Sequence, residues 1–252
     1  MRLEDLVSRM TAEVTRRTLA LFRSPKALKA MAQDWSLASQ ARILGDALAK
    51  KFKKLFDDEA WDIAESMVQE ASHVSQAAVA SNLKKIGGEL LTIKTDFVTA
   101  GMKEVMTASV AENVSLIKSI PEKYLQQVQG DVMRSISMEG KGVADLTKSL
   151  EKYEGVTKNR AANIAEDQTR RVYTSLNSKR LQKVGLDKFQ WKYNYVGQAS
   201  RELHVAMDGQ IFSFSDPPVI QDSPRVTGLP GDLPYCHCTA IPVVSFDDDE
   251  DE

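Results

Sequence analysis

The sequence predicts an α+β protein in which an extended, mainly α-helical N-terminal region is followed by a small β-rich C-terminal module. Up to Val184, apolar residues recur at the spacing of amphipathic helices. Between Phe189 and Tyr195, four aromatic residues alternate with three polar ones, which is the period of a half-buried strand. Eight of the 17 aromatic residues (3 Trp, 6 Tyr and 8 Phe in all) and six of the 8 prolines follow residue 187, where we expect a domain boundary.

Helices are expected throughout the first 186 residues. Ser24-Pro25 stops the first helix, because proline disfavours helix in the residue before it. Asp57-Asp58-Glu59 is expected to open a helix, Pro121 to occupy a first turn, Thr157 to serve as an N-cap and Gly185 to act as a stop. The expected helices are residues 3–23, 43–55, 57–87, 90–120, 121–139, 143–153 and 157–184. Two further strands are expected at 211–214 and 239–244.

Charge and hydropathy narrow the class of protein. The formal net charge is -2, but the last six residues, 247–252, are all acidic, so the rest of the chain carries −2 + 6 = +4. Such a tail is either solvated or in contact with a basic partner. No apolar run is long enough to span a membrane, and the early Glu4-Asp5 argues against a secretory signal. We therefore expect a protein that is made and kept in the cytoplasm unless something else carries it out.

Both cysteines of the chain lie in one Cys-x-Cys unit, Cys236 and Cys238. With His204 they form a candidate metal site, because zinc takes thiolate and imidazole ligands in tetrahedral sites. Side chains alternate along an extended segment, so His237 faces away from the two thiols, and Asp208 or water would have to complete the site. Reduced structural cysteines and a strained Cys236–Cys238 disulfide remain open as alternatives.

The region that carries His204, Cys236 and Cys238 is a candidate for a catalytic role as well as for a structural one. A Cys–His pair with Arg201 and Asp208 has the groups needed for nucleophilic or acid-base chemistry. Nothing in the sequence orders them for it, and Asp208-Gly209 is most simply a tight turn that leads into Ile211. No catalytic residue is therefore predicted.

The segment from Lys158 to Lys192 carries nine basic residues against three acidic ones. An excess of this kind can hold a phosphate backbone or an acidic partner surface. At 100° per residue, however, the charges scatter around the helix, so an ordinary solvated helix is the alternative. The candidate binding residues are Lys158, Arg160, Arg170, Arg171, Lys179, Arg180 and Lys183.

Several of these short motifs, taken in order, resemble a known family. In the helical part they are 113–121, Gly140-Lys141-Gly142, Gly155-Val156-Thr157, Arg160-Ala161 and Ile164-Ala165. In the C-terminal module they are Arg201-x-x-His204, Asp208-Gly209 and Cys236-x-Cys238 with Pro242. Over about residues 110–244 the chain resembles the Mu F-like phage head morphogenesis proteins. His237 stands where this family commonly has arginine, so no role of that arginine is carried over.

The resemblance implies a minor head (capsid) protein of a tailed phage or prophage, present in few copies inside the head. It implies association with the portal protein, further contacts with scaffold, major capsid protein or genomic DNA, and assistance in head assembly, DNA packaging or delivery. The expected segments are a helical docking region at 1–110, the helical part of the head morphogenesis domain at 111–186, the Cys/His module at 187–246 and the acidic tail at 247–252. Two alternatives remain: a metal-dependent nucleic-acid-processing enzyme or toxin-like module, and a non-specific DNA-binding protein.

Overall fold

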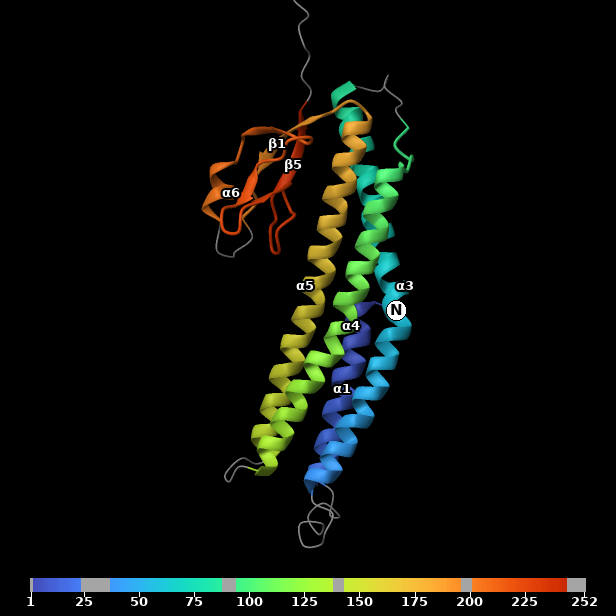
Figure 1. The fold of residues 1–252 in the computed structure, drawn as a ribbon, viewed down its shortest axis with the longest axis vertical. Helices are drawn as coiled ribbons and strands as arrows, with labels where there is room; N and C mark the ends of the chain where they lie inside the picture. Colours follow the sequence, from blue (N-terminus) through green and yellow to red (C-terminus); the bar gives the residue numbers. More distant parts are fainter. Residues whose placement is uncertain (1, 24–36, 88–93, 138–142, 196–200, 244–252) are drawn as a thin grey trace, which may run out of the picture. The chain divides into compact units, whose positions relative to one another are not determined.

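A computed structural model describes residues 2–23, 37–87, 94–137, 143–195 and 201–243. It confirms the predicted fold class, with long helices followed by a small antiparallel β-sheet module (Figure 1). None of the described helices is long and apolar enough to cross a bilayer. In chain order the elements are α1 (Leu3–Arg23), α3 (Leu37–Gly87), α4 (Ala100–Ser137), α5 (Val143–Lys183), β1 (Lys188–Lys192), α6 (Glu202–Ala206), β2 (Ile211–Ser213), β3 (Val219–Gln221), β4 (Val226–Thr227) and β5 (Thr239–Val243).

The chain divides into two compact units, each made of two separate segments. Unit 1 comprises Met1–Glu65 and Val110–Ala165, and unit 2 comprises Ser66–Ser109 and Glu166–Glu252. Helices α3, α4 and α5 each contribute to both units, and the break at Ser109 and Val110 lies next to the predicted boundary at residue 110. The acidic residues 247–252 lie outside the described part of the chain.

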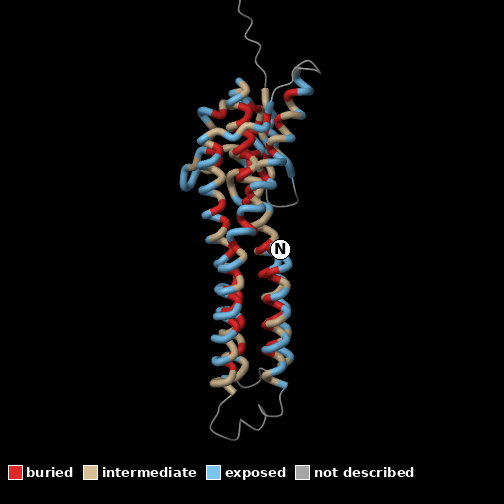
Figure 2. The backbone as a smooth tube through the Cα atoms, turned by 90° about the vertical axis from the view of Figure 1, so that its right-hand side faces the viewer, coloured by how far each residue is buried: buried red, intermediate tan, exposed pale blue. Residues whose placement is uncertain are grey.

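Unit 1 is built from α1 and from parts of α3, α4 and α5. Buried residues recur along one side of each helix (Figure 2), as the helical spacing of the apolar residues predicts. The largest fully buried side chains of this unit include Phe52, Phe56 and Tyr124. Ion pairs at its surface, such as Lys51–Glu13 at 2.5 Å, have partly exposed partners and so contribute little to stability.

The second and third predicted helices are one continuous helix, α3, so the start predicted at Asp57-Asp58-Glu59 is wrong. Asp57 and Asp58 are exposed, whereas the adjacent Phe56 and Ala60 are fully buried, so the apolar stripe continues past the acidic residues. No glycine or proline interrupts residues 46–86. The predicted end at Gly87 is confirmed.

Helix α4 differs from the prediction at two places. It begins at Ala100, and residues 94–99 are not helical, because the Thr99 hydroxyl accepts the Met102 amide at 3.3 Å and caps the helix there. Pro121 lies inside the helix and not at the start of a new one. Ile117, Ile120 and Tyr124 keep the same side buried across the proline, so packing maintains the helix despite one missing backbone hydrogen bond.

Helix α5 is likewise a single helix, and Thr157 is not its N-cap. The buried Thr157 hydroxyl donates a hydrogen bond to the Tyr153 carbonyl one turn earlier, at 2.6 Å. The predicted stop at Gly185 is confirmed. Gly185 has a φ of 88°, and the amides of Gly185 and Leu186 bond to the carbonyls of Gln182 and Leu181, which is the Schellman pattern.

The β module of unit 2 centres on β1. Strands β2 and β5 pair with it antiparallel on either side, and β3 and β4 form a separate two-stranded sheet. Phe189 and Trp191 are fully buried, which confirms the alternation, but the strand ends at Lys192 and Tyr195 is 70% exposed. The core of the module also contains Val79 and Leu83 of α3 and Leu181 of α5, all within unit 2.

Candidate metal centre

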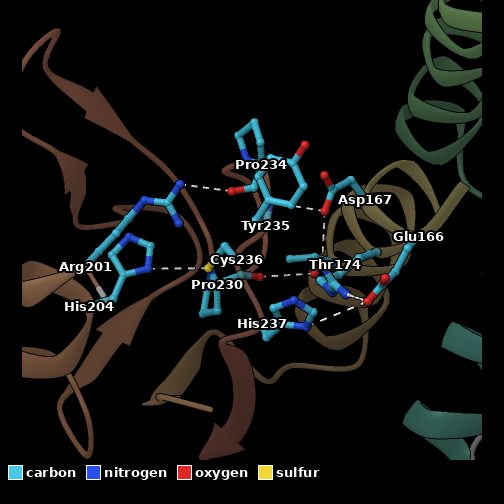
Figure 3. A network of polar contacts seen from close by, with 11 residues as sticks. Glu166, Asp167, Thr174, Arg201, His204, Pro230, Pro234, Tyr235, Cys236 and His237 are labelled. Carbon is cyan, nitrogen blue, oxygen red and sulfur yellow. Dashed lines mark hydrogen bonds and ion pairs between the residues drawn. The ribbon is translucent and has the colours of Figure 1, made fainter. Parts of the chain in front are cut away.

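Helix α6 and the residue before it place the two residues of the Arg201-x-x-His204 motif about one turn apart. Arg201 precedes the helix in extended conformation, and its Nη2 donates to the Pro234 carbonyl at 2.9 Å. His204 lies within the helix and packs edge-on against Trp191, with ring centroids 5.2 Å apart. Both side chains therefore reach the same 234–238 segment, which explains the spacing of the motif in physical terms (Figure 3).

His204 Nδ1 lies 3.4 Å from Cys236 Sγ and 3.6 Å from Cys238 Sγ. The ligand atoms of these three residues all lie within 4.8 Å of one another, and both cysteines are free. His204 is 2% exposed and each cysteine 3% exposed. The structure thus brings together the three residues that the sequence proposed as metal ligands and leaves them almost inaccessible to solvent.

The other ring nitrogen of His204 determines which tautomer is present. Nε2 lies 3.0 Å from the Ile220 carbonyl oxygen, which can only accept a hydrogen bond. Nε2 therefore carries a proton and donates a hydrogen bond to the Ile220 carbonyl oxygen. In the neutral imidazole the lone pair is then on Nδ1, the atom that faces both sulfurs.

The Cys-x-Cys segment has the predicted alternation. Cys236 and Cys238 are buried together, whereas His237 is partly exposed and its Nδ1 lies 3.8 Å from Glu166 Oε1. Asn194 Nδ2 donates to the His237 carbonyl at 2.9 Å and so holds the backbone between the two thiols. His237 is not available as a fourth ligand.

Helix α5 anchors the loop that carries the cysteines, within unit 2 (Figure 3). The Thr174 hydroxyl donates to the Pro230 carbonyl at 3.1 Å, and the Tyr235 amide donates to Asp167 Oδ1 at 3.1 Å. Tyr235 has a φ of 57°, unusual for a residue other than glycine, and this backbone turn directly precedes Cys236. The loop is therefore constrained on both sides of the thiols.

The pKa values of the two thiols shift in opposite directions. The hydrogen bond with Cys238 lowers the pKa of the Cys236 thiol, against the effect of burial, and the contact with His204 lowers it further. The same hydrogen bond with Cys236 raises the pKa of Cys238, and burial adds to the rise. The directions of these pKa shifts order the pair, so that Cys236 gives up its proton before Cys238 does.

Of the two predicted ways to complete the site, Asp208 or water, the structure does not place Asp208 with the cluster. Among the described residues, the group of possible ligands is limited to His204, Cys236 and Cys238. Asp208 Oδ1 instead accepts the Tyr193 amide at 2.8 Å, and this backbone bond, with help from Lys192, lowers the pKa of Asp208. Gly209, with a φ of 81°, completes the predicted turn into β2.

The predicted basic residues do not form one surface. Arg180 is 1% exposed and donates to the hydroxyls of Ser75 and Ser72 at 2.7 and 2.9 Å. It is therefore not available to a phosphate group, and its prediction as a binding residue is wrong. Arg170 pairs with Glu166 and Asp167, and Arg160 donates to the Ser119 hydroxyl at 3.0 Å. Lys158 and Lys183 are exposed, whereas Arg171 and Lys179 are partly buried.

Several residues that shape the site were missed from the sequence. The Ile220 carbonyl could not have been found, because a backbone acceptor carries no residue signature. Gly228 had a detectable signal as part of a Gly- and Pro-rich stretch: a Cβ there would lie 2.7 Å from Ile220 Cδ1. Asp232 is half-buried in the same stretch and accepts the Leu229 amide at 2.7 Å, while its partial burial raises its pKa.

The fold and the site define a class: helical proteins that end in a small β module with a buried Cys/His cluster. Residues 126–241 match the family model described as Phage Mu protein F like protein. This match to the Mu F-like family confirms the predicted resemblance over these residues. A protein of Haemophilus influenzae (strain Rd), described as an uncharacterized protein, is 32% identical over 207 residues. That alignment covers 82% of this chain and 44% of the relative, so the chain spans less than half of the relative's length. No solved structure shows a significant match.

Proposed function

We propose that this protein is a minor head protein of a tailed phage or prophage, associated with the portal inside the head, and that it assists head assembly, DNA packaging or delivery. The family match over residues 126–241 carries the proposal. It spans about the last third of α4, all of α5 and the module into β5, and so includes α6 and the loop that carry the Cys/His cluster.

The character of the cluster supports a structural role over a catalytic one. A catalytic zinc must be reached by its substrate and works with an acid or base beside it. Here the three residues are at most 3% exposed, and no carboxylate of the described residues belongs to the group. Incubation of the purified protein with DNA and RNA, with and without chelator, tests the alternative: metal-dependent cleavage would favour the enzyme.

The proposal is tested by deleting the coding region from its phage or prophage and restoring it from a plasmid. We expect purified wild-type particles to contain the chain in few copies, and deletion to reduce infectious particles until the plasmid restores them. Wild-type particles that lack the chain, with full infectivity after deletion, would reject the proposal. Co-expression with the candidate portal protein tests the portal association separately, and the absence of any co-purification would contradict it.

Genomic DNA is a further proposed partner, through the exposed Lys183 of α5. Binding by such residues releases counterions, so the affinity for duplex DNA must fall as salt increases. Lys183→Glu should weaken binding, whereas Lys85→Glu on α3 serves as a charge-matched control. Affinity that does not change with salt would exclude this mode of binding.

A further inference from the structure

We propose that His204, Cys236 and Cys238 bind one Zn²⁺ ion that holds the C-terminal module in its fold. The inference does not depend on the proposed role in the phage head, because it rests on the three ligand atoms and on the groups that orient them. It also requires no contact with DNA, portal or any other protein.

The spacing of the ligand atoms suits a tetrahedral zinc ion. With Zn–S bonds of about 2.3 Å and a Zn–N bond of about 2.0–2.1 Å, the tetrahedral angle separates nitrogen from sulfur by about 3.6 Å. His204 Nδ1 lies 3.4 Å from Cys236 Sγ and 3.6 Å from Cys238 Sγ. The ion would therefore enter a site that is already arranged, with little movement of α6 or of the loop before β5.

The orientation of the imidazole is the one that zinc-binding histidines adopt. Such residues usually donate their second ring N–H to a carboxylate or a backbone carbonyl, which fixes the tautomer. His204 Nε2 makes this bond to the Ile220 carbonyl at 3.0 Å, so the Nδ1 lone pair points at the two sulfurs. Without a metal, this lone pair can accept a hydrogen bond from only one of two neighbouring thiols at a time.

Charge balance also favours the ion. On binding, each thiol loses a proton to solvent, and two thiolates neutralise the two positive charges of Zn²⁺. With a neutral imidazole the group has no net charge, which suits residues that are 2–3% exposed. A water molecule completes the tetrahedron, because the described carboxylates lie outside the group.

The ion would join segments that otherwise have few regular contacts. His204 belongs to the five-residue helix α6 and is bonded to β3 through Ile220, while the cysteines precede β5. Strands β2 and β3 have three residues each and β4 has two. Small folds with so little regular structure commonly use a structural metal to add to a limited core.

The test is metal analysis of the full chain, produced without a histidine tag in zinc-supplemented medium and purified under reducing conditions without chelator. We expect about one zinc per chain. After zinc removal, Co²⁺ should give thiolate-to-cobalt charge-transfer absorption and d–d bands of tetrahedral intensity. His204→Ala should lower the zinc affinity at least about tenfold, whereas His73→Ala, at an exposed position of α3, should leave it unchanged.

Loss of zinc in Cys236→Ser or Cys238→Ser could reflect misfolding, so a second measurement uses the wild-type protein. Titration with p-hydroxymercuribenzoate should release one zinc as two thiols react. The proposal is overturned if reduced wild-type protein binds neither Zn²⁺ nor Co²⁺, if metal release does not follow thiol modification, or if His204→Ala retains wild-type affinity.

Discussion

Unit 1 and the β module at 187–243 are stabilised in different ways. Unit 1 repeats one contact type, with apolar side chains such as Phe52 and Phe56 along helices and ion pairs at the surface. The module at 187–243 has a mixed core, in which aromatic residues surround one imidazole and two thiols. In unit 1 stability is spread over many similar contacts, whereas in the module it depends on a few residues that cannot replace one another.

The largest effect is expected at Trp191. Its side chain is fully buried and contacts both His204 and Phe212, so Trp191→Ala should lower the free energy of unfolding by about 3–5 kcal/mol. Tyr195→Ala removes an aromatic side chain that is 70% exposed and should change stability by less than about 0.5 kcal/mol. Urea unfolding measures both, and equal losses would contradict the dependence of the module on few residues.

A buried cation in unit 2 gives the next effect. Arg180→Ala leaves the Ser75 and Ser72 hydroxyls without their donors and should cost about 2–3 kcal/mol. Arg180→Met should cost less, because it keeps volume and removes a charge whose burial already lowers the Arg180 pKa. Lys183→Met on the exposed side of the same helix is the control. A lower thermal unfolding temperature for Arg180→Met than for Arg180→Ala would refute this account.

Substitution of Gly155 within α5 and of Gly185 just after it should change stability in opposite directions. Gly155 lies in the helix interior with nothing within 4 Å of an added Cβ, so Gly155→Ala should stabilise by about 0.5–1 kcal/mol. Gly185 has equal space but a φ of 88°, so Gly185→Ala should destabilise by about 1–2 kcal/mol. Because the surroundings are equally open, the sign reports backbone conformation alone. If denaturant unfolding shows that both substitutions change stability in the same direction, backbone conformation does not decide the outcome.

The smallest effect is a pH dependence in unit 1. Burial opposes ionisation of Asp131, but hydrogen bonds from Tyr153, Arg134 and Ser149 prevail and lower its pKa. A lowered folded-state pKa stabilises the protein fully above the ordinary Asp value of about 3.9, and this contribution is lost as pH falls through the folded-state pKa. The stability difference between wild type and Asp131→Asn should therefore shrink on acidification. Tyr153→Phe should reduce that dependence, and an unchanged pH profile would exclude the Tyr153 hydroxyl as a cause.

The helices were predictable where the signal is local. The apolar periodicity of α1 and the glycine stop of α5 were both correct, because helical spacing and positive φ depend on nearby residues. The boundaries at Asp57, Pro121 and Thr157 were wrong for a shared reason. Each of these residue types is common at helix starts, yet packing of the buried side carries α3, α4 and α5 through them.

The candidate site was predictable in its members but not in its details. His204, Cys236 and Cys238 were recognised from ligand chemistry, and the alternation around His237 followed from extended geometry. Asp208 was one of two predicted ways to complete the site, and it lies apart from the cluster because its bond to the Tyr193 amide depends on the pairing of β1 with the turn before β2. The burial of Arg180 against α3 could not be predicted from the sequence either, since Arg180 and its partner Ser75 are about a hundred residues apart.

The amino-acid sequence by itself determined the fold class, the family resemblance and the three residues whose chemistry suits a metal. These follow from periodicity, residue type and order, which are properties of the chain alone. Only the tertiary structure decided that a backbone carbonyl orients the imidazole, that both thiols meet the same nitrogen, and that one arginine is buried while a nearby lysine is not. Those features arise from contacts between distant segments, which local spacing does not encode.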